Sequence, residues 1–201
     1  MTHPKAHLVD DDEAIRDALS WLLKSRGIPC ASYDSAESFL AAWQPAMAGC
    51  VVLDMRMSGM SGLDCFDQLR EQQSTLPVIF LTGHGDVPLA VSTLKKGAFD
   101  FFEKPFNDND LATRIQEAMA LDGRQREANA AVDSLKTRLA SLTTRERQIM
   151  ELVLAGKFNK VIADELNISM RTVEVHRANL FDKMQVKTAV ELANLIKSGH
   201  G

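Results

Sequence analysis

The chain has 201 residues and a net charge of −4, with 45% hydrophobic and 25% charged residues. This composition is ordinary for globular proteins and excludes the disordered and fibrous classes. No apolar run approaches the roughly 18–20 residues of a membrane-spanning helix, and no apolar signal segment precedes the first predicted strand. We therefore expect a cytoplasmic protein with no membrane partner.

The first part of the chain alternates strand and helix signals. Short apolar runs predict strands at about 7–10, 29–33, 50–54, 78–82 and 99–103. Amphipathic segments predict helices near 13–26, 35–44, 61–73, 86–97 and 107–121. Ser35 and Asn107 stand where helix N-caps are expected. Five strand–helix units in this rhythm predict an α/β fold, a doubly wound five-stranded parallel sheet with right-handed crossovers.

Strand signals end after about residue 105. Residues 123–140 are rich in Ala, Arg, Gln and Glu, and apolar residues recur there at helical spacing, at Val132, Leu135 and Leu139, continuing to Leu142. We expect either a helical linker that continues the fifth helix or a short partner-binding seam. A loose polar linker is the alternative.

The last part of the chain predicts a small all-α domain. Its short helices begin near residues 143, 159, 169 and 188. Thr143 and Glu146 have the spacing of a capping box. Two short helices joined by a three-residue turn make the helix-turn-helix unit. We therefore predict three parts: a first domain at 1–122, a helical linker at 123–140 and a helix-turn-helix domain at 141–201.

The two ends of the chain differ in charge. Residues 1–122 contain 10 Lys/Arg and 18 Asp/Glu, a balance of −8, whereas residues 123–201 contain 13 and 9, a balance of +4. Opposite signs suggest two different tasks, and the basic part is a candidate for nucleic-acid binding. The excess alone is weak support, because many solvated surfaces carry as much.

Polar side chains stand at the ends of four predicted strands. Asp10 and Asp11 follow the first strand, Asp54 ends the third, Thr82 ends the fourth and Lys104 follows the fifth. The carboxyl ends of parallel strands share one edge of the sheet, where open α/β folds build their sites. Each residue alone is explained by an ordinary cap or a solvated charge. Their joint placement indicates a site for a metal ion and a phosphoryl group.

The residue types suggest specific roles. Mg²⁺ takes oxygen ligands, which Asp11, Asp54 and the backbone carbonyl of Arg56 can supply, with Asp10 binding through water. Asp54 would be the nucleophile that forms an aspartyl-phosphate, and Lys104 would place a positive charge on a phosphoryl oxygen. A phosphohydrolase with an aspartate nucleophile is an alternative. Such enzymes usually carry a second Asp two residues on, but here that residue is Arg56, which cannot transfer protons at neutral pH.

These positions resemble the signature of bacterial response-regulator receiver domains, on Asp10-Asp11, Asp54, Thr82-Gly83 and Lys104-Pro105, over residues 5–122. The resemblance implies a sensor histidine kinase as phosphoryl donor, the strand order 2-1-3-4-5 and a cis Lys104–Pro105 bond. It implies self-phosphorylation and autodephosphorylation rather than enzymatic turnover. It also implies a switch, in which Thr82 moves toward the phosphate and the ring of Phe101 turns into the vacated space.

One position departs from this resemblance. Ser58 stands in the loop after Asp54, where the family usually carries proline. We expect a somewhat looser loop with intact chemistry.

The basic part resembles the LuxR-type helix-turn-helix, on Leu142-Thr143-x-Arg145-Glu146, Gly156, Asn159-Lys160-x-Ile162-Ala163 and Ser169-x-x-Thr172-Val173-x-Val175-His176. The segment Thr82-Gly83-His84-Gly85-Asp86-Val87-Pro88 is similar to the FixJ-like branch. Together they imply a two-component response regulator of the NarL/FixJ family that binds promoter DNA, with RNA polymerase as a further partner. A receiver that acts by protein contact alone is the alternative.

The third short helix is the predicted reading helix. Val173, Leu180 and Met184 share one face and are expected to pack in the core. The opposite face carries Arg171, Val175, Ala178 and Asp182, flanked by Glu174 and Asn179. In the major groove, Arg171 suits guanine, Glu174 suits cytosine and Val175 suits the thymine methyl group. Phosphate contacts are expected from Lys160, Thr172, Arg177, Asn179 and Lys183. His176 is expected to pack or to contact the DNA backbone.

The small positive excess also predicts dimerisation. A balance of +4 is low for DNA binding, so one domain alone should bind weakly and lose affinity with salt. Pairing two domains raises their effective concentration and requires two half-sites. We expect phosphorylation to drive homodimer formation through the fourth helix and the fifth strand, at residues 87–103.

Overall fold

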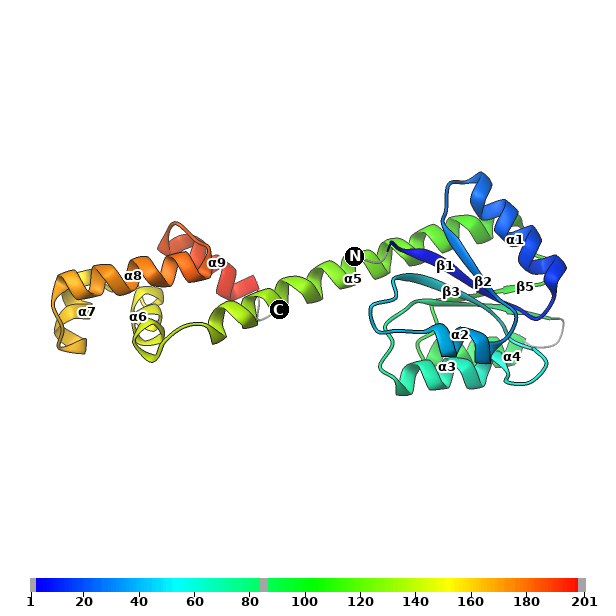
Figure 1. The fold of residues 1–201 in the computed structure, drawn as a ribbon, viewed down its shortest axis with the longest axis horizontal. Helices are drawn as coiled ribbons and strands as arrows, with labels where there is room; N and C mark the ends of the chain where they lie inside the picture. The colour runs from blue at the N-terminus through cyan, green and yellow to red at the C-terminus, as the bar shows by residue number, and fades with distance from the viewer. Residues whose placement is uncertain (1–2, 84–86, 199–201) are drawn as a thin grey trace. The chain divides into compact units, whose positions relative to one another are not determined.

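The computed structural model describes residues 3–83 and 87–198 (Figure 1). It divides into two compact units, Met1–Arg126 and Glu127–Gly201. Within the described residues, no helix combines the length and the apolar character needed to cross a bilayer. Residues 84–86 of the FixJ-like segment, and with them the expected start of the fourth helix, lie outside the described part.

The first unit contains one parallel sheet of five strands, in the order β2-β1-β3-β4-β5. The strands are β1 Lys5–Val9, β2 Cys30–Tyr33, β3 Gly49–Asp54, β4 Val78–Thr82 and β5 Asp100–Glu103. All six residues of β3 are buried, as expected for a strand covered by helices on both faces. The predicted fold class and strand order are confirmed.

Helices cover both faces of this sheet (Figure 1). They are α1 Glu13–Ser25, α2 Ala36–Ala42, α3 Gly62–Glu71, α4 Val87–Lys95 and α5 Asp108–Ala140. One core packs α1 and α5 on the sheet through Leu19, Leu23, Leu111 and Ile115. The other packs α2 and α3 through Phe39, Cys65, Phe66 and Leu69.

Side-chain caps fix where these helices begin. The Ser35 hydroxyl accepts a hydrogen bond from the Ser38 N–H, and the Asn107 side chain accepts from the N–H groups of Asn109 and Asp110. Both predicted caps are therefore confirmed. Asp12 caps α1 in the same way by accepting from the Ala14 N–H. The helix starts set where each loop leaves the carboxyl edge of the sheet.

The fifth helix extends through residues 123–140, where a helical linker that continues it is one of the predicted alternatives. It continues from Asp108 to Ala140 and includes all of residues 123–140, so the loose polar alternative for that segment is wrong. Leu135 is buried in the core of the second unit, with Leu139 packed against it. The domain boundaries placed at 122 and 140 stay a prediction.

The second unit adds four helices: α6 Thr144–Leu154, α7 Asn159–Leu166, α8 Met170–Met184 and α9 Ala189–Ser198. The predicted capping box is present, since Thr143 accepts from the Glu146 N–H and the Glu146 carboxylate accepts from the Thr143 N–H. The α7–α8 turn is closed by Asn167 in the left-handed conformation and by the N-cap Ser169. These contacts place α8 against α6 and α7, over one apolar core.

Candidate functional site

The carboxyl edge of the sheet brings the predicted polar side chains together. Asp10 directly follows β1, Asp54 ends β3, and Lys104 directly follows β5. The Lys104 ammonium Nζ lies 3.0 Å from Asp10 Oδ2 and 3.1 Å from Asp54 Oδ1. Asp10 is 2% exposed and Asp54 is 7% exposed, so water screens these charges poorly. The lysine therefore links two buried carboxylates that are far apart in the sequence.

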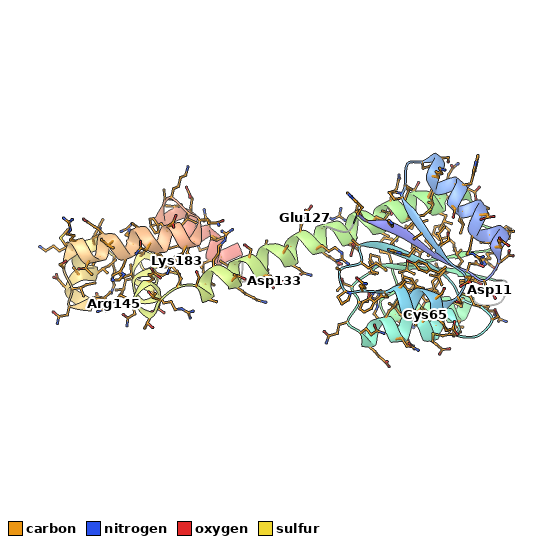
Figure 2. The ribbon with its side chains drawn as sticks, in the orientation of Figure 1. Asp11, Cys65, Glu127, Asp133, Arg145 and Lys183 are labelled. Carbon is orange, nitrogen blue, oxygen red and sulfur yellow. The ribbon has the colours of Figure 1, made fainter. Side chains whose placement is uncertain are left out.

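A third carboxylate completes an acidic group. Asp11 is exposed at this edge of the sheet (Figure 2), and one oxygen from each of Asp10, Asp11 and Asp54 lies within 4.8 Å of the others. Asp10 is held by further bonds, because its Oδ1 accepts from the Asp12 N–H and its backbone carbonyl accepts from Arg16. An all-oxygen set of this size matches the ligands that Mg²⁺ prefers.

The electrostatic environment separates these groups. Burial raises the pKa of Asp54, the hydrogen bond from Lys104 opposes that increase, and the charges of Asp10 and Asp11 add to it. Burial alone would lower the pKa of Lys104, but its hydrogen bonds to Asp10 and Asp54 outweigh burial and raise that pKa. The N–H and hydroxyl of Ser58 lower the pKa of Asp11. A relatively basic carboxylate thus lies beside a firmly protonated lysine.

The loop after Asp54 is held by hydrogen bonds on two sides. The Ser58 N–H donates to Asp11 Oδ2 at 2.7 Å, and the Met60 N–H donates to Glu37 Oε1 at 2.9 Å. The sequence drew attention to Ser58 but did not indicate either partner. Two hydrogen bonds therefore restrain this loop, and the expectation that it is looser without proline stays a prediction.

Gly62 closes the same loop against the strand end. Its N–H donates to the Met55 carbonyl at 3.2 Å. A Cβ atom at this position would lie 2.1 Å from the Asp54 carbonyl oxygen, far inside any permitted contact. Glycine thus lets the first turn of α3 lie directly on the Asp54 backbone. No local signal in the sequence indicates this contact, because the Asp54 backbone lies eight residues earlier in the chain.

The predicted switch residues occupy the neighbouring strands. Thr82 is fully buried, and its hydroxyl donates to the Phe102 carbonyl at 3.4 Å. Phe101 is half-buried and packs against the core on the α2–α3 face. The Lys104–Pro105 bond is cis, as the resemblance implies. The roles of Thr82 and Phe101 in switching stay predictions.

The second unit presents one face of α8 to solvent. Val173, Leu180 and Met184 are buried, as the helical wheel predicts. Exposed residues on the other side include Arg171, Glu174, Val175, Ala178, Asn179 and Asp182, and Lys160 of α7 is exposed as well. Val175 is 54% exposed although it is apolar. An exposed methyl surface between polar groups is suited to a groove of DNA.

Three expected phosphate contacts have partners inside the second unit. Arg177 donates to Asn159 Oδ1 at 2.6 Å and lies over the Phe181 ring. Lys183 of α8 (labelled in Figure 2) donates to the buried carboxylate of Glu146 at 2.7 Å. The Thr172 hydroxyl pairs with that of Ser169. These contacts stabilise the domain. His176, which is expected to pack or to contact the DNA backbone, is half-buried. Their contacts with DNA stay predictions.

Comparisons with known families match both units. Residues 6–116 match the response regulator receiver domain, and residues 140–196 match the bacterial regulatory proteins of the luxR family. The chain is a response regulator of the NarL/FixJ family. This confirms the predicted family: the response regulator combines a receiver domain with a LuxR-type DNA-binding domain.

Similar proteins align over almost the whole response regulator. The transcriptional regulatory protein FixJ of Bradyrhizobium diazoefficiens is 45% identical over 189 residues, covering 94% of this chain and 92% of that protein. The regulatory protein DctR of Rhodobacter capsulatus is 48% identical over 192 residues, covering 94% and 97%. The solved structure of the response regulator StyR has a TM-score of 0.92 at 39% identity, covering 98% and 99%.

Proposed function

We propose that Asp54 accepts a phosphoryl group from a sensor histidine kinase and that this modification controls DNA binding by the LuxR-type domain. The observation that carries the proposal is the pair of bonds from Lys104 to Asp10 and Asp54, beside the exposed carboxylate of Asp11. A positive group beside a partly buried nucleophilic carboxylate is the arrangement that phosphoryl transfer requires.

In the proposed reaction, an Asp54 oxygen attacks the phosphorus atom of the donor. A bond forms between that oxygen and phosphorus while the bond from phosphorus to the donor's histidine nitrogen breaks. Lys104, which is already bonded to Asp54, would then neutralise charge on a phosphoryl oxygen. The same site would allow self-phosphorylation by a small phosphodonor and slow hydrolysis of the product.

The acidic group fits a divalent cation. Asp11, Asp54 and the backbone carbonyl of Arg56 would hold Mg²⁺, and Asp10 would bind it through water. All of these donors are oxygen atoms, and the three carboxylates carry more negative charge than Lys104 balances. A bound Mg²⁺ would supply positive charge against repulsion between the carboxylates and the phosphoryl oxygens.

Thr82 and Phe101 form the proposed switch. The Thr82 hydroxyl bonds to the Phe102 carbonyl at a long 3.4 Å, so a phosphoryl oxygen would be a competitive acceptor. Movement of Thr82 would leave space beside the half-buried Phe101 ring on β5. A charge change at Asp54 would in this way alter the surface of β5.

That surface supports a proposed homodimer. Leu89, Val91 and Leu94 of α4 are exposed apolar side chains on the element next to β5. Burying such side chains against a second copy removes apolar surface from water. Sedimentation velocity before and after treatment with acetyl phosphate and Mg²⁺ should show conversion from monomer to dimer. An unchanged sedimentation coefficient in a verified phosphorylated sample would exclude this step.

The second unit is the proposed reader of promoter DNA, with RNA polymerase as the partner at the promoter. Arg171, Glu174 and Val175 are exposed in the first two turns of α8, the part of a recognition helix that reaches base edges. Ala178 and Asn179 continue the same face, and Lys160 is available for a phosphate. Contacts from Thr172, Arg177 and Lys183 would add to these only if their internal bonds are shared or exchanged.

The test combines phosphorylation with DNA binding. Mapping of bound genomic DNA should give a defined set of promoters for the native chain and far fewer for Asp54→Asn. In gel-shift assays on one such promoter, Arg171→Ala and Lys160→Ala should weaken binding, whereas Lys136→Ala on the exposed side of α5 should not. Equal binding by all of these variants would contradict the proposed DNA contacts of Arg171 and Lys160. No binding of promoter DNA by the native chain would support a receiver that acts by protein contact alone, and steady turnover of a phosphate ester would support a phosphohydrolase.

A further inference from the structure

A backbone hydrogen bond joins two loops at the acidic group. The Ser58 N–H donates to Asp11 Oδ2 at 2.7 Å, although the two residues are 47 positions apart. This distance is at the short end of the range for N–H···O bonds, as expected when the acceptor is charged. The bond connects the loop after β1 with the loop after β3, and both loops carry proposed ligands of the same cation.

The Asp11 carboxylate has fewer other restraints than the carboxylates of Asp10 and Asp54. Asp10 and Asp54 are buried and bonded to Lys104, so their carboxylates are already held in place. Asp11 is exposed, and its side chain would otherwise be able to rotate in water. The Ser58 N–H binds Asp11 Oδ2, one of the two oxygens of this carboxylate. The N–H also restrains the chain two residues after Arg56, the proposed carbonyl ligand.

The loop that carries Ser58 is also held from the opposite side. Glu37 of α2 accepts from the Met60 N–H at 2.9 Å. Gly59, which lies between Ser58 and Met60, has a φ of +87°, and a Cβ there would lie 2.9 Å from Glu37 Oε1. The Ser58 N–H is therefore presented by a loop that is fixed at two points, which lowers the entropy cost of keeping it on Asp11.

We propose that the backbone N–H of Ser58 is a positioning group for Asp11 that raises the affinity of the acidic group for Mg²⁺. The inference rests on the proposed metal site and adds a positioning role that the sequence does not assign to Ser58. Groups that hold a ligating carboxylate in place strengthen metal binding. Proline, the usual residue at this position in the resemblance above, has no N–H to donate.

Isothermal titration of the full chain with Mg²⁺ alone tests the proposal. Ser58→Pro removes the N–H together with the hydroxyl and should weaken Mg²⁺ binding by about three- to tenfold, the range expected for one exposed hydrogen bond. Ser58→Ala removes the hydroxyl, which also interacts with Asp11, but keeps the N–H, so its loss of Mg²⁺ affinity should be clearly smaller than that of Ser58→Pro. Affinity in Ser58→Pro that equals or exceeds the native value would overturn the proposal, as would an equal loss in Ser58→Ala.

Two further measurements separate the bond from general loosening of the loop. Glu37→Ala frees the loop at Met60 but leaves the Asp11 bond, so Mg²⁺ affinity should again stay within about twofold. A loss as large as in Ser58→Pro would assign the effect to loop order and overturn the proposal. In Mg²⁺-free protein, the Ser58 amide proton should resonate downfield and shift upfield in Asp11→Ala. An unshifted resonance would show that the bond is absent, whatever the folding of the proline variant.

The Mg²⁺ titration also distinguishes failure of this inference from failure of the proposed function. If the native chain bound no Mg²⁺, or if Asp54→Asn bound it as tightly, the metal site itself would be wrong. Native binding that Asp54→Asn weakens and Ser58→Pro leaves unchanged would overturn the role of Ser58 alone.

Discussion

Replacing Gly62 by alanine should disturb the proposed phosphoacceptor without touching its side chain. A Cβ at Gly62 would lie 2.1 Å from the Asp54 carbonyl oxygen and 3.0 Å from the Asp54 carbonyl carbon, whereas ordinary contacts begin at 3.4 Å. Both contacts are with backbone, so no flexible side chain can move aside. The first turn of α3 and the end of β3 would therefore have to separate by about 1 Å.

Two effects should follow from this separation. Overpacking of this kind costs about 1–3 kcal/mol of folding free energy. A misplacement of about 1 Å near reacting groups can lower a rate by about 100-fold, and here it would disturb the 3.1 Å bond between Asp54 and Lys104. We expect Gly62→Ala to lower the melting temperature of the receiver and to slow phosphorylation by acetyl phosphate at least tenfold, as followed by intact-mass spectrometry.

Gly123→Ala is the matched control, because a Cβ at Gly123 of α5 would meet no atom within 4 Å. The same chemical change should there leave the phosphorylation rate unchanged. If Gly62→Ala were phosphorylated at the native rate and melted at the native temperature, close contact of α3 with the Asp54 backbone would not be what positions the carboxylate.

Three other predictions follow from the structure. Gly123→Ala should stabilise the chain toward urea by about 0.5–1 kcal/mol, because alanine favours a helix interior, and a loss of stability would contradict the contact-free site. Because burial raises the pKa of Asp54, the ionised form of this carboxylate opposes folding. Asp54→Asn should therefore raise the melting temperature at pH 7, as reported by Trp21 and Trp43. Mg²⁺ should stabilise the native chain but not this variant. In the second unit, burial opposes ionisation of Glu146, but its bonds from Lys183 and Thr143 outweigh burial and lower its pKa below 4.5. The Glu146 charge therefore adds to the free energy of unfolding above that pH, and this contribution is lost as the pH falls through the lowered pKa. Glu146→Gln should reduce this pH dependence of stability, as followed by circular dichroism. The signal of the tryptophans, which are both in the first unit, should stay unaffected.

The sequence predicts the sheet and its edge well, because the decisive signals are local. An apolar run that ends in Asp54 indicates a buried parallel strand, and chain connectivity brings the ends of such strands to one edge. The helix caps at Ser35 and Asn107 also depend on neighbouring residues alone. The strand β1 begins two residues before its predicted start, because Lys5 pairs through its backbone with β3 while its side chain stays exposed.

Partners that are distant in the chain were harder to predict. Lys183 lies on the helix that is expected to read DNA, and its charge alone suggests a phosphate contact. The structure gives it Glu146 of another helix, a residue that the capping box explains only in part. Ser58 likewise gains its importance from Asp11 in another loop. Such pairings depend on how the elements pack. Hydrophobic periodicity and charge along the sequence do not show which distant side chains will meet.

The central claim is that Asp54 accepts a phosphoryl group beside a divalent cation. Intact-mass spectrometry after incubation with acetyl phosphate and Mg²⁺ should show one labile phosphoryl adduct, mapped to Asp54 by peptide analysis and absent from Asp54→Asn. The absence of any adduct in the native chain, or an adduct on another residue, would contradict this account.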